Sequence, residues 1–289
     1  MALRYLEEIK KTVREEEENF ESVMKQRVGE KAYDSFYKDY AMKLWGRNPT
    51  EISAQVGRRG RFLGAKELFE KVLLNDKSFF YYPSQGIGQI CESLAEKIIQ
   101  EGGKIITNAK VDEITVEGKS VETVYYSNNN QRKSINTSTL VSTIPLDDLH
   151  NFIHNHSNNQ LAWRGLILLV IQLENKVAGD CETYYFPNTS TMIGRVSEIK
   201  KYSPKINDSI SSSILTIEIP SSIKEESWSM SEDELVEVCR KDLQDMGVIN
   251  RGNSIKKRFI KRFQKCYPLY TSGWSKNYEN IQNRLDYDN

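Results

Sequence analysis

Apolar residues recur at helical spacing through the first 75 residues. Met24, Val28, Ala32, Phe36 and Tyr40 follow one another four residues apart. This spacing brings them onto one face of a helix. The segment Trp45-Gly46-Arg47-Asn48-Pro49 ends that face, since glycine and proline stop helices. The pattern therefore predicts a helical N-terminal part.

The pattern changes near Ser78. Ile87, Ile90, Leu94 and Ile98 line one helical face, which ends at Gly102-Gly103. Short strands are predicted at 104–107 and 140–144, and a hairpin is predicted from 111–116 and 121–126 around the turn at Gly118. We expect the helix to pack against this small sheet.

From Trp163 onward the pattern is mostly that of strands, predicted at 164–173, 182–187, 191–197, 212–219 and 253–264. Their alternation favours an antiparallel sheet with one solvated face. One helix is predicted at 231–246, where Ser231 and Glu234 form a capping box. We therefore predict an α+β fold, with an α/β portion, in three parts: 1–75, 76–150 and 151–289.

Charge and composition exclude several classes of protein. The chain has 40 Lys and Arg against 40 Asp and Glu, so no overall basic field attracts nucleic acid. Its four cysteines form no C-x-x-C pair, which argues against a zinc or thioredoxin motif. Four scattered thiols in a chain of this size fit a reducing compartment. The longest apolar run, Leu166 to Leu173, is too short for a membrane span. We expect a cytoplasmic protein without a nucleic-acid partner and without a membrane span.

A glycine-rich segment and a histidine group are candidate sites. Gly86-Ile87-Gly88-Gln89-Ile90-Cys91 imitates a dinucleotide-binding fingerprint. Cys91 replaces its third glycine, so we favour a simple start of a helix over a phosphate site. His150, His154 and His156 lie close together, but we interpret them as exposed residues of a polar loop and expect no metal.

Two basic segments could bind phosphate or nucleic acid, or could simply be exposed to solvent. Arg58-Arg59-Gly60-Arg61 could hold a phosphate, although a solvated loop is the more frequent outcome. Basic residues alternate with Phe259, Ile260 and Phe263 between 256 and 263, as in some nucleic-acid faces. With the balanced net charge, we favour a half-buried edge strand with a charged outer face. The sequence contains no G-x-S-x-G, P-loop or H-E-x-x-H motif, so it indicates no standard nucleophile or metal site.

Four stretches together resemble one superfamily. It comprises the flavin amine oxidases and protoporphyrinogen oxidase-like proteins and includes the UDP-galactopyranose mutases. The stretches are similar to family motifs and occur in the family's order: 37–46 with 49–53 (YKDYAMKLWG, PTEIS), 82–86 with 102–114, 141–146 (VSTIPL) and 266–270 (CYPLY).

The resemblance implies FAD as cofactor and a set of site residues. The backbone of Val111 would face the adenine, and Thr143, Ile144 and Pro145 would lie near the cofactor. The substrate side would comprise Trp45, Arg58, Arg61, Tyr267 and Tyr270. The family's first G-x-G-x-x-G segment and its last FAD-binding segment have no counterpart in this sequence. We therefore expect a central fragment that binds FAD poorly by itself.

The resulting function is an FAD-dependent oxidoreductase of the amine oxidase or protoporphyrinogen oxidase-like type, acting on a small molecule. One alternative is a flavin-dependent UDP-sugar mutase, to which Trp45 and the pair Arg58 and Arg61 would be suited. Another is a non-catalytic remnant or a module that depends on a second chain carrying the missing FAD-binding segments.

Overall fold

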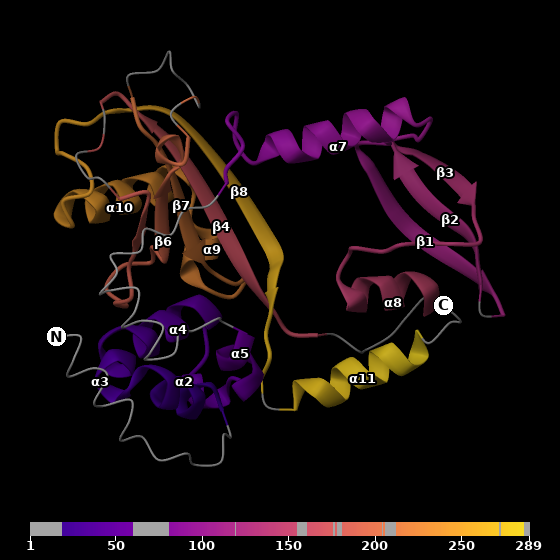
Figure 1. Ribbon diagram of the computed structural model, residues 1–289, viewed down its shortest axis with the longest axis horizontal. Helices are drawn as coiled ribbons and strands as arrows, with labels where there is room; N and C mark the ends of the chain where they lie inside the picture. Colours follow the sequence, from indigo (N-terminus) through magenta and orange to yellow (C-terminus); the bar gives the residue numbers. More distant parts are fainter. Residues whose placement is uncertain are drawn as a thin grey trace. The chain divides into compact units, whose positions relative to one another are not determined.

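The computed structural model describes residues 19–59, 81–118, 120–154, 161–175, 177, 181–203, 205, 212–271 and 273–285 (Figure 1). The chain divides into two compact units. The first comprises Met1–Gln89 and Trp163–Ser272, and the second comprises Ile90–Ala162 and Gly273–Asn289. Each unit is therefore formed by segments that are far apart in the sequence.

Short helices open the first unit. They are α2 (Phe20–Val28), α3 (Glu30–Ala32), the π-helix η1 (Tyr33–Tyr37), α4 (Lys38–Trp45), the 3₁₀ helix η2 (Pro49–Glu51) and α5 (Ala54–Arg59). The predicted continuous stripe is interrupted, because Gly29 ends α2 with φ +82°. Phe20, Met24, Val28, Tyr33, Ala41 and Ile52 form the buried cluster of these helices.

A five-stranded antiparallel sheet completes the first unit, in the order β5-β6-β7-β4-β8. Its strands are β4 (Trp163–Leu173), β5 (Thr183–Tyr185), β6 (Arg195–Glu198), β7 (Ile214–Pro220) and β8 (Ile255–Pro268), and its helices are η3 (Ile199–Lys201), α9 (Glu226–Ser229) and α10 (Glu232–Asp245). The predicted antiparallel sheet is confirmed, as is the capping box of Ser231 and Glu234. β8 is an edge strand, as expected, but Phe259 and Phe263 on it are exposed, so the strand is less buried than the sequence predicted.

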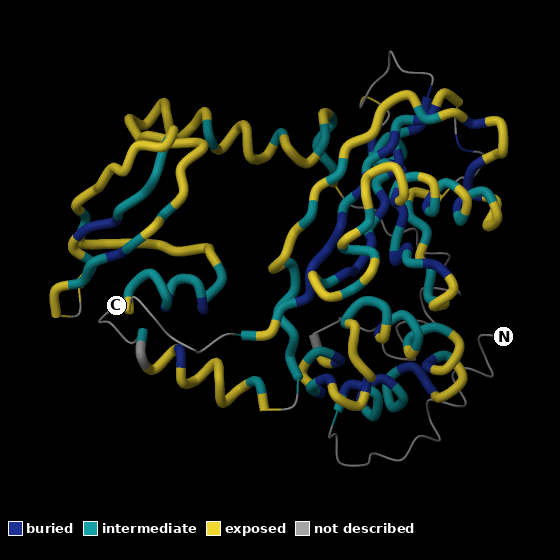
Figure 2. The backbone as a smooth tube through the Cα atoms, turned by 180° about the vertical axis from the view of Figure 1, so that it is seen from behind, coloured by how far each residue is buried: buried dark blue, intermediate teal, exposed yellow. Residues whose placement is uncertain are grey.

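Alternation along the strands separates two faces of this sheet. On one face Ile167, Leu169 and Ile171 pack in the main core with buried residues of α10. The backbone coloured by burial shows buried stretches in the strands of this sheet (Figure 2). On the opposite face, the register pairs Tyr185 with Arg195 and Arg195 with Glu218. Paired residues share a face, so these three side chains form a row.

The second unit contains α7 (Gly88–Gln100), which starts in the first unit, together with β1 (Ala109–Glu117), β2 (Ser120–Asn128), β3 (Gln131–Asn136), α8 (Leu146–His154) and α11 (Trp274–Arg284). The predicted hairpin is confirmed as β1 and β2. The third strand, β3, was not predicted; it follows a turn in which Asn129 and Asn130 both have positive φ.

Three expectations for this unit were wrong. The segments 104–107 and 140–144 are not strands, because no strand in the described part of the chain pairs with them. The apolar face of α7 is not packed: its residues are all described and none is buried, with Leu94 60% exposed. Helix α8 instead contacts β1 and α11.

Candidate substrate pocket

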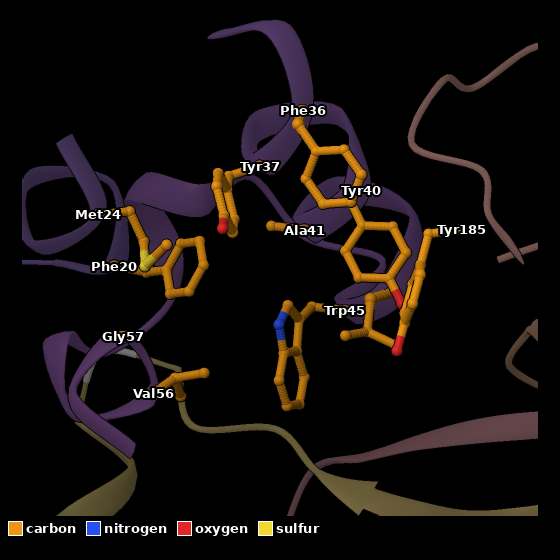
Figure 3. Close-up of a pocket in the computed structure, with 11 residues that line it drawn as sticks. Phe20, Met24, Phe36, Tyr37, Tyr40, Ala41, Trp45, Val56, Gly57 and Tyr185 are labelled. Carbon is orange, nitrogen blue, oxygen red and sulfur yellow. The ribbon is translucent and has the colours of Figure 1, made fainter. Parts of the chain in front are cut away.

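A pocket of about 460 Å³ lies between the N-terminal helices and β5 (Figure 3). Aromatic and aliphatic side chains form nearly all of its wall. The lining residues are Phe20, Met24, Phe36, Tyr37, Tyr40, Ala41, Leu44, Trp45, Val56, Gly57 and Tyr185. All of them belong to the first unit.

The aromatic wall follows from an irregular helix. Residues Tyr33–Tyr37 form a π-helix directly before α4, and π-turns change the angular position of the residues around them. The ring of Phe36 stacks on that of Tyr40 at 5.4 Å between centroids, and Tyr40 meets Tyr185 edge-on at 5.9 Å. The helix and the sheet thus contribute to one continuous aromatic surface.

A charged pair adjoins this surface. The guanidinium of Arg195 lies 5.9 Å from the ring centre of Tyr185, and it forms an ion pair with Glu218. Burial opposes the charge of Arg195, but hydrogen bonding to Glu218 and Tyr185 outweighs it and raises the pKa of Arg195. Burial also raises the pKa of Tyr40 to about 12. Tyr40 therefore carries a neutral hydroxyl at pH 7.

Two of the predicted substrate residues are brought together. The rings of Trp45, at the end of α4, and Tyr267, on β8, meet edge-on with centroids 6.1 Å apart. Burial raises the pKa of Tyr267. Tyr270 lies farther along, where its carbonyl accepts a 2.7 Å hydrogen bond from the Ser53 N–H.

The predicted arginines differ in position. Arg58 is exposed on α5, directly after the pocket residues Val56 and Gly57. Arg61 lies outside the described residues. The structure therefore gives no geometry for the pair as an anion site.

The predicted cofactor residues lie in the second unit. Val111 is half-buried on β1, an edge strand that leaves one row of backbone groups outside the ladder. A bulge next to it interrupts the β1–β2 register between Val111 and Glu113. Thr143 and Ile144 are exposed, while the carbonyl of Pro145 accepts from the N–H groups of Asp148 and Leu149 at the start of α8.

These residues fit one part of FAD. An edge strand with open N–H and C=O groups suits the hydrogen-bonding edge of an adenine. For a pyrophosphate, the described residues offer Gly86 and Gly88 at the entry to α7. Gly86 has φ +98°, a conformation that glycine adopts without strain and that a larger residue would not.

The interpretation of His150 as an exposed loop residue was wrong, whereas His154 is exposed as expected, although on a helix. His150 belongs to helix α8 and is 1% exposed, with its ring 4.5 Å from that of His154. The apolar residues of this segment, Leu146, Leu149, Phe152 and Ile153, are spaced for one face of a helix, so the segment is a helix and not a loop. Within the described ranges, no group of three His, Cys, Asp or Glu is arranged for a metal; His156 lies outside them, so the metal prediction remains untested.

Sequence analysis missed most of the pocket. Tyr40 was assigned to a helical core stripe, and Tyr185 and Arg195 to ordinary strand positions. One signal was available: five aromatic residues, Tyr33, Phe36, Tyr37, Tyr40 and Trp45, occur within one short segment. The contribution of Tyr185 depends on strand register, which gives no such signal.

Comparisons with known proteins identify the fold. The family model of UDP-galactopyranose mutase (GLF) matches residues 35–244. A crystal structure of reduced UDP-galactopyranose mutase superposes with a TM-score of 0.74 at 18% identity, over 98% of this chain and 63% of that one. A putative protoporphyrinogen oxidase from Exiguobacterium sp. 255-15 gives 0.69 at 14% identity, also over 98% and 63%.

A third structure, an oxidoreductase from Methanosarcina mazei, gives a TM-score of 0.59 at 13% identity, over 94% of this chain and 62% of that one. No curated protein matches the sequence. The chain thus spans less than two thirds of the length of these solved structures. Among the residues that the structure describes, no helix is long and apolar enough to cross a lipid bilayer. The matches confirm the superfamily resemblance and the α+β fold: the chain belongs to the UDP-galactopyranose mutase family, within a superfamily of flavoproteins that includes protoporphyrinogen oxidase-like proteins.

Proposed function

We propose that this chain binds a UDP-sugar in the aromatic pocket and contributes to a flavin-dependent mutase, the alternative named by the sequence analysis. The observation that carries the proposal is the aromatic surface of Tyr40, Trp45 and Tyr185, which lies within the family-matched residues. A flat, largely apolar cavity wall suits a pyrimidine ring, because stacking on an aromatic side chain contributes about 1–3 kcal/mol per base.

In this proposal, polar groups around the pocket orient the rest of the nucleotide. The neutral hydroxyl of Tyr40 donates a hydrogen bond, and Arg58 with Arg61 binds the diphosphate, since guanidinium groups form paired hydrogen bonds with phosphate oxygens. Arg195 is paired with Glu218 and lies against the ring of Tyr185. In this proposal, Arg195 therefore positions Tyr185 and does not bind the diphosphate. The aromatic wall excludes water from the sugar.

The cofactor of the proposed enzyme is FAD. When bound, a flavin supplies the chemistry at the anomeric carbon of the sugar. The backbone of Val111 would hold the adenine, and the turn of Thr143, Ile144 and Pro145 would lie along the cofactor. The open edge of β1 supports this assignment.

We further propose that an α/β polypeptide carrying the other FAD-binding segments packs on the second unit. Ile105, Ile106 and Val141 are exposed in segments whose sequences are typical of buried strands, and α7 exposes its apolar face beside them in sequence. The longer relatives contain additional chain that this protein does not match. Added strands would pair segments 104–107 and 140–144 and cover these side chains.

Binding of UDP tests the proposed substrate. We expect UDP and UDP-galactose to bind the purified chain in isothermal titration, and Tyr40→Leu to weaken both at least tenfold. The matched control is Phe259→Leu, which removes an exposed aromatic ring on β8 away from the pocket lining. Equal affinities of Tyr40→Leu and the unchanged chain, or no binding of UDP at millimolar concentration, would refute the proposal.

A second candidate is an oxidoreductase that takes an apolar substrate. The nearly complete apolar lining of the pocket favours it, since no charged side chain lines the pocket among the described residues. In that case, the pocket variants should change the affinity for apolar amines or ring compounds, and UDP should not bind to the chain.

A further inference from the structure

Arg164 is an arginine buried at the start of β4. Only 3% of the residue is exposed, although a guanidinium has five N–H groups that need partners. Its Nε donates to the carbonyl of Leu44, and its Nη2 donates to those of Lys43 and Pro220 at 3.1, 3.1 and 2.9 Å respectively. Its Nη1 donates to Ser222 Oγ at 2.8 Å and to Glu225.

Two of these partners are carbonyls that a helix leaves open. Helix α4 ends at Trp45, and Gly46 closes it with φ +61°. The last four carbonyls of a helix have no intrahelical partner, and the C-terminal end carries partial negative charge. Arg164 therefore donates hydrogen bonds to the open carbonyls of Lys43 and Leu44, and its positive charge complements the negative end of the helix.

The same arginine lies beside the ring partner of Trp45. In the β4–β8 register the residue opposite Arg164 is Tyr267, and the ring of Tyr267 meets that of Trp45. The backbone of Arg164 thus aligns Tyr267, while its side chain holds the two residues directly before Trp45. Arg164 is therefore connected to both rings, through its side chain to the helix end that carries Trp45 and through strand pairing to Tyr267.

We infer that Arg164 is a positioning residue, which holds Trp45 against Tyr267 and so sets the place of Trp45 in the pocket wall. The inference rests on the proposed function for what the wall recognises, but the positioning itself is independent of any ligand. Lysine is not equivalent here, because its three N–H groups start from one atom and do not span partners on α4 and on the segment from Pro220 to Glu225.

The test follows Trp45 directly. The chain contains four tryptophans, and 5-fluorotryptophan labelling gives each a ¹⁹F resonance, with that of Trp45 assigned by Trp45→Phe. We expect Arg164→Lys to shift or broaden the Trp45 resonance and to weaken UDP binding at least tenfold, while the resonance of Trp274 in the other unit stays unchanged.

The matched control is Ser222→Ala. It removes one partner of the same guanidinium but leaves the bonds to Lys43 and Leu44, so the Trp45 resonance should stay in place and UDP affinity should change less than twofold. A Trp45 resonance that is unmoved in Arg164→Lys would overturn the inference. If the unchanged chain does not bind UDP, the proposed function fails, and the resonance still decides the role of Arg164.

A measurement on the unchanged chain covers the case in which Arg164→Lys does not fold. The Arg164 Nε–H, identified by its NOEs to Leu44, should exchange slowly with solvent. In a urea series, the Trp45 resonance should broaden at the concentration at which this protection is lost. Broadening of Trp45 while the Nε–H remains protected would overturn the inference.

Discussion

Replacing Gly46 by alanine should destabilise the first unit more than any strain in the backbone explains. An added Cβ at Gly46 would lie 2.8 Å from Nη1 of Arg164 and 2.9 Å from its Cζ. Alanine at this positive φ costs about 1–2 kcal/mol by itself. Displacing a buried guanidinium also weakens bonds to a charged group, each worth about 1.5–3 kcal/mol. We expect a total loss of about 3–5 kcal/mol.

Gly247 provides the matched control in the same unit. It has φ +72° and nothing within 4 Å of an added Cβ, so Gly247→Ala should lose only the backbone contribution of about 1–2 kcal/mol. Urea unfolding followed by circular dichroism measures both variants, provided that the urea dependence of the unfolding free energy is unchanged. Equal losses in the two variants would refute the claim that Arg164 occupies the space beside Gly46.

Three further predictions address other parts of the chain. Burial lowers the pKa of Lys43 to about 8, so the native chain binds fewer protons than the unfolded chain between pH 8 and 10.5 and stability should rise with pH there. Between pH 8 and 10.5, the free energy of unfolding in urea should rise by about 1 kcal/mol more in the unchanged chain than in Lys43→Met, after allowance for screening by solvent. A difference between the two chains that does not change with pH would contradict this. Leu169→Ala should cost about 2–5 kcal/mol in urea unfolding, because Leu169 is fully buried. Leu168→Ala, on the half-buried opposite face, should cost clearly less, and similar losses would contradict the assignment of faces. Titrated FAD should keep its free fluorescence with this chain alone, because a few backbone hydrogen bonds of about 0.5–1.5 kcal/mol each do not offset the cost of association; a stoichiometric yellow complex would contradict this.

Local chemistry made part of the fold predictable. The hairpin of β1 and β2 was found because its turn contains Gly118, which has φ +60°, and α10 was found because Ser231 and Glu234 cap it. These signals lie within a few residues of the structure that they specify. They therefore need no knowledge of distant segments.

Elements that depend on distant partners were not predictable. Segment 140–144 has the composition of a strand, but a strand forms only when another strand pairs with it, and none in the described part does. The π-turn at Tyr33–Tyr37 changes which side of the helix Phe36 and Tyr40 occupy. The contact between Trp45 and Tyr267 joins helix α4 to strand β8, so it depends on how these distant segments pack rather than on local sequence.

The long edge strand β8 has a consequence for behaviour in concentrated solution. Its 14 residues present an outer row of N–H and C=O groups that could recruit another chain, and such edges are starting points for aggregation. Six lysines and arginines lie along the strand, at 256, 257, 258, 261, 262 and 265. A second β8 approaching in either direction would bring these cations together. Because the whole chain is electrically neutral, repulsion that opposes self-association comes from this strand rather than from the protein's net charge.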